Sequence, residues 1–378
     1  MIYKDPCVYA VGNEYQIVIN TLEHGMCWVE AGGEKFNDSV GGLIRTETLL
    51  HRVSVPMQVL DSAKGYRVCF RALADRKPYF PEPGPLKERF YPFRPVDTAK
   101  ELNIYMLADT HSQVDAPVRA AGYFGDALDV LIMNGDIPTA SQSHEDIRSI
   151  FDITSAVTHG SIPVVFARGN HDYRGRYATD LPMYIGNNNG DTWFTFRLGS
   201  LWGMVLDCGE DKEDSCPEYG GMVDCHSMRL KETRFIEGVI ADAENEYLAE
   251  GVETRLIITH VPFCAECVYC GQEVFNIENE LFTGWTQLIN RIKPHAMLCG
   301  HMHFTRVVLP GTDDMRMGAE FPVVICSEPY LNKGASCTRP EHAGAKHIGL
   351  AVRINNEKID FTATGDGGTK EKLFSIRK

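Results

Sequence analysis

From residue 102 onward the chain repeats one pattern, a short apolar run that ends in a cluster of Asp, His or Asn side chains. Segments with the periodicity of amphipathic helices separate these runs. The alternation predicts an α/β sheet covered by helices, with the polar clusters outside the carboxyl ends of its strands. The predicted strands are residues 103–108, 130–134, 162–166, 255–259 and 296–299, and the predicted helices are residues 118–128, 146–157, 230–248 and 281–292.

Further strands are predicted on either side of the later helices. Residues 192–196 and 201–206 are typical of a hairpin, because Gly199 and Ser200 between them favour a turn. The sequence after Gly365 is polar and predicts a loose tail. The remaining predicted strands are residues 323–326, 348–354 and 359–364.

The first 97 residues have the pattern of an all-β domain. Alternating apolar runs, separated by Gly and Asp clusters, predict a small β-sandwich, and residues 65–71 resemble part of a fibronectin type III-like domain. Eight residues, 78–85, then contain four prolines, a density that forbids a helix or a central strand. We therefore place a domain boundary between about residues 78 and 100, with the predicted domains at residues 1–97 and 98–378.

The composition excludes several classes of protein. A formal net charge of -14 disfavours binding to nucleic-acid phosphates, which need a basic face. No apolar stretch approaches the roughly 20 residues of a membrane span, and residues 1–6 carry no apolar targeting run. Most of the twelve cysteines stand alone in apolar runs, as buried thiols do in a reducing compartment. We expect a cytoplasmic protein without nucleic-acid or membrane partners, and nothing in the sequence predicts its oligomeric state.

The polar clusters contain the ligand types of a two-metal site. Two divalent cations about 3.5–4 Å apart need a shared carboxylate, further oxygen and imidazole ligands, and open positions for water and substrate. Asp136 is the natural bridge, because a lone carboxylate after a glycine can reach both ions. Carboxylate and imidazole together suit Zn, Fe or Mn. The candidate ligands are Asp109, His111, Asp136, Asn170, His260, His301 and His303.

Taken in order, the blocks Asp-x-His, Gly-Asp, Gly-Asn-His-Asp, His and Gly-His-x-His closely resemble the calcineurin-like metallophosphoesterase family over about residues 102–305. The resemblance implies a four-layer α/β/β/α sandwich. It also implies that His171 stabilises the phosphoryl oxygens or protonates the leaving group, and that Asp172 orients His171. One metal ion would be held by Asp109, His111, Asp136 and His303, and the other by Asp136, Asn170, His260 and His301.

Two subgroups of this family match less well. A β-sandwich before the core is similar to the arrangement in purple acid phosphatases, but Thr139 stands where those enzymes carry a Tyr ligand, and His111 stands where they have Gly. A purple iron site is therefore not expected. Phosphoprotein phosphatases carry Asp-Arg-Gly after the second block, and residues 139–141 are Thr-Ala-Ser. Phosphoprotein specificity is not expected either.

Some residues have two interpretations. Arg168 is suited to bind a substrate phosphate through two hydrogen bonds, and equally to a structural salt bridge. Cys264, Cys267 and Cys270 have a spacing that, with a fourth ligand, would hold an extra structural zinc ion. The other interpretation is that these cysteines are buried thiols, because no second Cys-x-x-Cys completes the pattern.

These observations predict a metal-dependent phosphoesterase that acts on a small phosphorylated substrate, either a monoester or a diester. A hydroxide between the two metal ions would attack phosphorus in line with the leaving oxygen. A second hypothesis is a non-catalytic metal-binding scaffold for protein–protein interaction on the same fold. A third is hydrolysis of a non-phosphate ester or a nucleotide anhydride at the same site.

Overall fold

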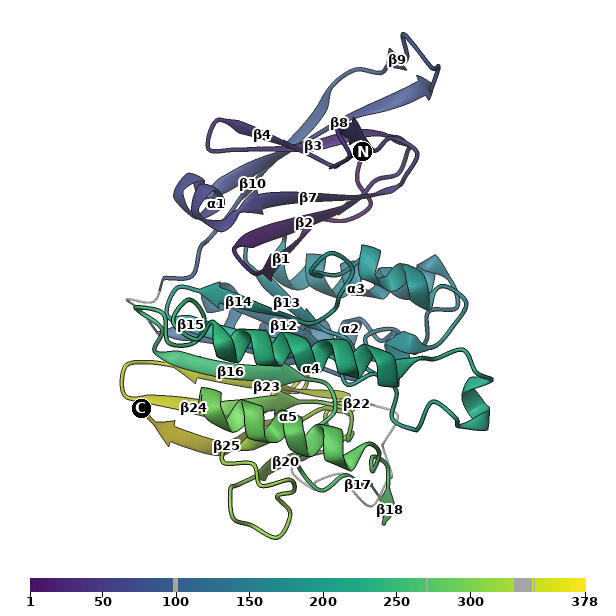
Figure 1. The fold of residues 1–378 in the computed structure, drawn as a ribbon. Helices are drawn as coiled ribbons and strands as arrows, with labels where there is room; N and C mark the ends of the chain where they lie inside the picture. The colour runs from purple at the N-terminus through teal and green to yellow at the C-terminus, as the bar shows by residue number, and fades with distance from the viewer. Residues whose placement is uncertain (98–100, 270, 330–341, 343) are drawn as a thin grey trace.

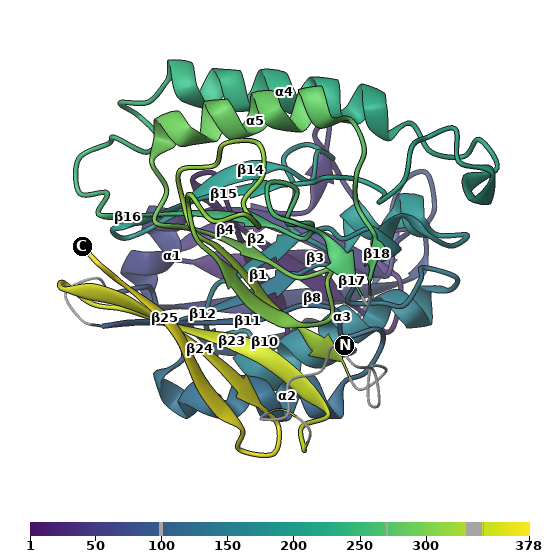
Figure 2. The ribbon, with the colours of Figure 1, turned by 90° about the horizontal axis from the view of Figure 1, so that it is seen from below.

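The computed structural model describes residues 1–97, 101–269, 271–329, 342 and 344–378. Two β-sheets face one another, with helices on both outer faces (Figure 2). Helices α2 (Asp115–Ala121) and α3 (His144–Thr158) cover the first sheet, and α4 (Cys225–Ala241) and α5 (Asn279–Ile292) cover the second. The α/β core with an N-terminal all-β region, as expected, is confirmed (Figure 1).

The first sheet has ten strands and is continuous with the N-terminal region. The three strands at its centre run parallel to one another. Strands from the C-terminal part of the chain pair antiparallel on one side of them. The strand order is β25 (Lys370–Arg377), β24 (Lys358–Gly365), β23 (His347–Ile354), β11 (Leu102–Leu107), β12 (Val130–Asn134), β13 (Val164–Ala167), β1 (Cys7–Val11), β2 (Glu14–Asn20) and β7 (Leu50–Pro56), with β22 (Glu328–Pro329) beside β23.

The second sheet has six strands and carries the last two predicted ligand loops. Its strand order is β14 (Phe194–Leu198), β15 (Leu201–Leu206), β16 (Thr254–Thr259), β19 (Ala296–Cys299), β21 (Val323–Cys326) and β20 (Thr305–Val308). Successive side chains of its strands point to opposite faces. In β16, for example, Leu256 and Ile258 pack in the core between the sheets, whereas Ile257 packs under α4 and α5.

The N-terminal region is a sandwich of two antiparallel layers. Strands β1, β2 and β7 form one layer, and the other is ordered β10 (Lys87–Pro92), β8 (Gly65–Asp75), β3 (Gly25–Ala31) and β4 (Glu34–Asn37). β1 also pairs in parallel with β13, at Tyr9 and Val164, so this region and the core share one sheet. The domain boundary near residue 97 stays a prediction. β10 lies at a sheet edge, where proline is tolerated.

Short elements complete the fold. They are helix α1 (Met57–Ala63), the 3-10 helices η1 (Gly122–Ala127), η2 (His171–Tyr173), η3 (Ala178–Met183) and η4 (Pro217–Tyr219), the hairpins β5 (Ser39–Val40) with β6 (Leu43–Ile44) and β17 (Val268–Tyr269) with β18 (Gln272–Glu273), and β9 (Glu82–Pro83) beside β8.

Two local predictions were wrong. The predicted helix at residues 118–128 ends as an α-helix at Ala121 and continues as η1, because Gly125 adopts φ 53° and interrupts it. The predicted tail after Gly365 is instead strand β25, which pairs along β24. Its apolar residues Leu373, Phe374 and Ile376 pack against the core, while its lysines are exposed on this edge strand.

Candidate metal centre

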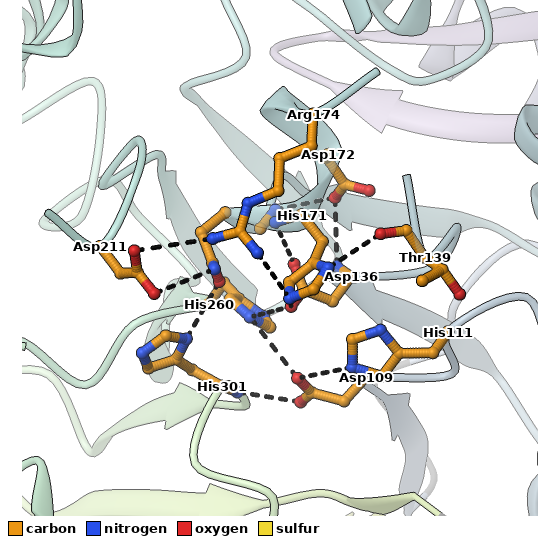
Figure 3. A network of polar contacts seen from close by, with 12 residues as sticks. Asp109, His111, Asp136, Thr139, His171, Asp172, Arg174, Asp211, His260 and His301 are labelled. Atoms are coloured by element: carbon orange, nitrogen blue, oxygen red, sulfur yellow. Dashed lines mark hydrogen bonds and ion pairs between the residues drawn. The ribbon is translucent and has the colours of Figure 1, made fainter. Parts of the chain in front are cut away.

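The predicted ligands lie in loops at the carboxyl ends of central strands of both sheets, and Figure 3 shows most of them converging on one site. Asp109 and His111 follow β11, and Asp136 follows β12, in the first sheet. His260 follows β16, and His301 follows β19, in the second. The expectation that all of them share the edge of one sheet was wrong. Because they come from two facing sheets, they can surround a site from both sides.

Five of the seven predicted ligands have a left-handed backbone. The φ angle is 54° at Asp109, 46° at His111, 54° at Asp136, 67° at His301 and 53° at His303. An L-residue in this region costs of order 1–3 kcal/mol, and such strain gathers at functional sites because the surrounding fold maintains it. Here the strained backbone of three loops directs the ligand side chains towards one point.

Two glycines allow the loops to approach closely. A Cβ on Gly135, which has φ +79°, would lie 2.5 Å from His260 Nδ1. A Cβ on Gly169 would lie 2.3 Å from Asp136 Oδ1. Gly135 and Gly169 are therefore needed to place the ligand side chains.

The ligand atoms form overlapping groups around the two aspartates. Asp109 Oδ1 lies 3.1 Å from His303 Nε2 and 3.9 Å from His111 Nε2. On the other side, His260 Nε2 lies 3.7 Å from Asp109 Oδ1 and 3.3 Å from Asp136 Oδ2. Asp109 and Asp136 each belong to two groups of candidate ligands. The bridging position predicted for Asp136 is compatible with this geometry, and Asp109 lies equally centrally.

Asn170 and His301 extend the second group. Asn170 Oδ1 lies 3.0 Å from His301 Nδ1, and the His301 backbone N–H donates to Asp109 Oδ2 at 2.9 Å. The Asn170 amide group donates to Asp211 Oδ2 at 3.4 Å, which leaves its oxygen beside His301. All seven predicted ligands are thus brought together, and Asp211 is an additional residue that orients one of them.

The donor set fits two divalent cations. Buried polar atoms normally have hydrogen-bond partners. In the described part of the chain, the buried atoms Asp109 Oδ1 and His260 Nε2 form no hydrogen bond of good geometry. A cation between them would satisfy both atoms. The identity of the metals stays a prediction.

The charges of the cluster also suit metal binding. Burial opposes ionisation of Asp109 and Asp136, but the adjacent His260 holds the pKa of both carboxyl groups below its ordinary range. Burial lowers the pKa of His111 and of His301 to about 4. At neutral pH these aspartates are anionic and His111 and His301 are neutral, which are the forms that bind a cation. Although burial opposes it, the charges of the aspartates raise the pKa of His260 to about 10 and also raise that of His303, so these two ligands release a proton when a cation binds.

His171 lies beside this cluster with its ring held from both sides. Its Nδ1 lies 2.8 Å from the carbonyl oxygen of Thr139, and its Nε2 lies 2.9 Å from Arg174 Nη1 and 4.0 Å from Asp136 Oδ2. A carbonyl oxygen only accepts and a guanidinium only donates. The proton of the neutral ring is therefore on Nδ1, and Nε2 faces the metal cluster (Figure 3).

Asp172 does not orient the His171 ring, as the family resemblance implied; Thr139 does. The buried Asp172 Oδ2 accepts hydrogen bonds from the backbone N–H groups of Gly169, at 2.8 Å, and Asp136, at 3.1 Å. Burial and the nearby charge of Asp136 raise the pKa of Asp172 to about 8. Asp172 therefore fixes the backbone around Asp136.

For Arg168 the structure favours the salt bridge over a phosphate-binding role. Its Nε donates to Asp207 Oδ2 at 2.6 Å, its guanidinium lies 3.8 Å above the Tyr173 ring, and its side chain is only 13% exposed. The Asp207 backbone N–H donates in turn to the buried Glu232 Oε1 at 2.8 Å. This network supports the loop that carries Asn170.

Glu232→Gln is expected to change the pH dependence of stability. Burial and the charge of Asp207 raise the pKa of Glu232 well above its ordinary value of 4.5. The folded protein therefore holds this proton more tightly than the unfolded chain, and stability falls as the pH rises above about 4.5. Gln keeps the acceptor for Asp207 and does not titrate.

Thermal unfolding of both proteins between about pH 4 and pH 8 tests this expectation. The wild type should lose stability relative to Glu232→Gln as the pH rises, and the exposed Glu237→Gln on the same helix should show no such trend. A difference that does not vary with pH would mean that Glu232 is already ionised in the folded protein.

The structure also bears on the cysteines. Cys264 and Cys267 are buried in the core under α4 and α5, and burial raises the pKa of the Cys267 thiol to about 12. Among the described residues neither belongs to a group of three candidate metal ligands. Cys270 lies outside the described residues, so the extra zinc ion stays a prediction. Both Cys264 and Cys267 are free thiols.

A buried cluster of aspartates and histidines between two facing sheets defines a candidate dinuclear metal centre. Residues 102–304 match the family described as calcineurin-like phosphoesterase. The chain belongs to this family. No curated protein matches its sequence.

Two solved structures show how far the fold is shared. The chain is similar to a purple acid phosphatase from yellow lupin (Lupinus luteus) seeds, with a TM-score of 0.60 and 10% identity over 100% of this chain and 74% of that one. It is also similar to the structure of PhoD, with a TM-score of 0.54 and 8% identity over 98% of this chain and 92% of that one. The coverage includes the N-terminal β region. No helix in the described residues has both the length and the apolar character to cross a membrane.

Proposed function

We propose that this protein is a dinuclear metal-dependent phosphoesterase that hydrolyses a small phosphorylated substrate, with His171 assisting the leaving group. The observation that supports this most strongly is the convergence of seven ligand side chains from two sheets, five of them held in a left-handed backbone. A cytoplasmic location is part of the same proposal, supported by the free thiols.

Each residue has a defined task in this proposal. Asp109, His111, Asp136 and His303 would hold one cation, and Asp136, Asn170, His260 and His301 the other. When bound, the cations supply Lewis-acid stabilisation of phosphoryl oxygens and activation of water. His171 keeps one proton on Nδ1, aligned by Thr139, and when substrate replaces the Arg174 contact at Nε2, its protonated form presents Nε2–H to the leaving oxygen.

Metal analysis paired with hydrolysis assays tests the function. The purified protein should contain two divalent metals per chain and hydrolyse an aryl phosphomonoester or phosphodiester, and chelation should abolish turnover. Two bound metals without turnover of either ester would contradict hydrolysis of simple aryl phosphate esters. Nucleotide anhydrides and non-phosphate esters would then be the substrates to assay. Absence of both metals and turnover would favour the scaffold hypothesis.

His171→Ala is expected to retain both metals and to lose about 10²–10⁴-fold in kcat on a substrate with a poor leaving group. The loss should shrink as the leaving group improves, because a good leaving group needs no proton. A series of aryl phosphates of graded acidity measures this, and the half-exposed His24→Ala serves as the control. An equal loss across the series would reject the acid role and leave phosphoryl binding as the function of His171.

A further inference from the structure

We propose that Arg174 binds the terminal phosphoryl oxygen that the two metal ions leave uncovered, and that it thereby makes the site selective for phosphomonoesters. The inference rests on the proposed function and deepens it by naming the substrate class. Arg174 lies three residues after His171, outside the five sequence blocks, and its local sequence does not mark it as a phosphate-binding residue.

Arg174 is held at the rim of the metal cluster by a buried carboxylate. Its Nε and Nη2 donate to the two oxygens of Glu210 at 2.9 and 2.8 Å, and the Glu210 side chain is only 1% exposed. Tyr219 donates a further hydrogen bond to Glu210 at 3.2 Å. This bidentate pairing fixes the plane of the guanidinium and leaves its remaining edge, Nη1, pointing at His171 (Figure 3).

The guanidinium keeps donor capacity for a ligand. Of its five N–H groups, two are used by Glu210 and one points to His171 Nε2. Within the described residues the second Nη1 hydrogen has no hydrogen-bond partner, and the second Nη2 hydrogen meets only Asp211, at 3.6 Å. The side chain is 32% exposed, which leaves these hydrogens accessible to a ligand. Arg168, by contrast, is 13% exposed and bound to Asp207.

The position of Arg174 explains why a monoester fits best. Its Nη1 lies 2.9 Å from His171 Nε2, the atom that faces the metal cluster, so an anionic oxygen bound by one is within reach of the other. A phosphomonoester has three terminal oxygens and up to two negative charges, and two metal ions leave at least one oxygen uncovered. In a phosphodiester one of the three terminal oxygens is replaced by a second ester oxygen, which is uncharged and carries a substituent. A fixed cation at this place therefore favours the monoester.

The test compares the wild type with Arg174→Gln on matched aryl mono- and diesters and, independently of turnover, on inorganic phosphate. The metal content of the variant should stay at two per chain. Its kcat/KM for the monoester should fall about 10- to 100-fold, as for the loss of a charge-assisted hydrogen bond. Its kcat/KM for the diester should change by less than about 3-fold, so that the preference for the monoester collapses. The affinity of the metal-loaded protein for phosphate, measured by calorimetry, should fall in parallel with the monoester activity.

Two further variants separate this role from a structural one. Arg174→Gln leaves Glu210 buried without its cation, whereas the double variant Arg174→Gln with Glu210→Gln restores a neutral hydrogen-bonded pair. The double variant should unfold at the same temperature as the wild type and still show the lost preference. Arg67→Gln, which removes an exposed arginine–glutamate pair between β8 and β10, should leave both activities unchanged.

The outcomes distinguish this inference from the proposed function. Equal losses on both esters, unchanged phosphate affinity, or a wild type that prefers diesters would each overturn the role of Arg174. A wild type with two metals and no turnover on either ester would contradict the proposed function, yet the phosphate titration of Arg174→Gln would still decide whether Arg174 binds the anion.

Discussion

Asp136→Asn should give a folded protein that binds at most one metal tightly and is nearly inactive. Asp136 is fully buried, its Oδ1 accepts the His171 backbone N–H at 2.8 Å, and its Oδ2 lies 3.3 Å from His260 Nε2. Asn has nearly the same size as Asp, but it lacks the negative charge that two adjacent metal cations need from a shared ligand. Residues that only support metal ligands cost about 10–100-fold when replaced, so a shared ligand should cost more than about 100-fold in kcat/KM.

Elemental analysis and hydrolysis assays on the same preparation measure this effect. The matched control is Asp152→Asn on the surface of α3, where the carboxylate pairs with Lys4 outside the site. The control should keep two metals and full activity. If Asp136→Asn retained both metals and most of its turnover, Asp136 would not be the shared ligand, and the central position of Asp109 Oδ1 would make Asp109 the residue to replace next.

Gly169→Ala should be nearly as damaging, although it removes no functional group. The added Cβ would lie 2.3 Å from Asp136 Oδ1 and 2.6 Å from the Asp136 backbone nitrogen, closer than such atoms approach, so the Asp136 loop has to move. Overpacking of this kind costs about 1–3 kcal/mol of stability. A displacement of an ångström at a catalytic group costs about 10²-fold in rate. We therefore expect both a lower unfolding temperature and a loss of metal affinity.

Gly284→Ala provides the matched control. Gly284 lies within α5, and a Cβ added there would meet no atom within 4 Å. Replacing a helical glycine by alanine where the Cβ has room stabilises by about 0.5–1 kcal/mol, so this variant should unfold at a slightly higher temperature and keep its metals. Full metal loading of Gly169→Ala would show that the loop relaxes without moving Asp136, and that Gly169 is not required for the site.

Local sequence patterns were enough to find the candidate ligands because each block spans only a few neighbouring residues. A short apolar run followed by Asp, His or Asn identifies a strand end, and the blocks Asp109 to His111 and His301 to His303 each lie within three residues. The helices were also found, although α4 begins at Cys225 and ends at Ala241, earlier than the predicted residues 230–248. Strand β25 was missed because its lysines interrupt the apolar pattern in the sequence. Its apolar face is recognised only from its pairing with β24.

The partners of the reacting groups were not predictable in this way. Thr139 lies 32 positions from the His171 ring that it orients, and Glu210 lies 36 positions from Arg174. No local pattern encodes such contacts, since both residues lie in loops whose relative positions depend on how the strands pair. The same reason explains why Arg168, and not Arg174, was chosen as the candidate phosphate-binding residue: it is adjacent to the Gly-Asn-His-Asp block.

The sequence by itself determined which side chains make up the candidate metal centre and in what order, because a strand end and its polar residues are read within a few positions. Only the tertiary structure decided that these ends belong to two facing sheets, that β1 joins the N-terminal region to the core beside β13, and that Arg174 is held against His171 by Glu210. Those arrangements arise from pairing and packing between distant segments, whose free energies depend on the whole fold.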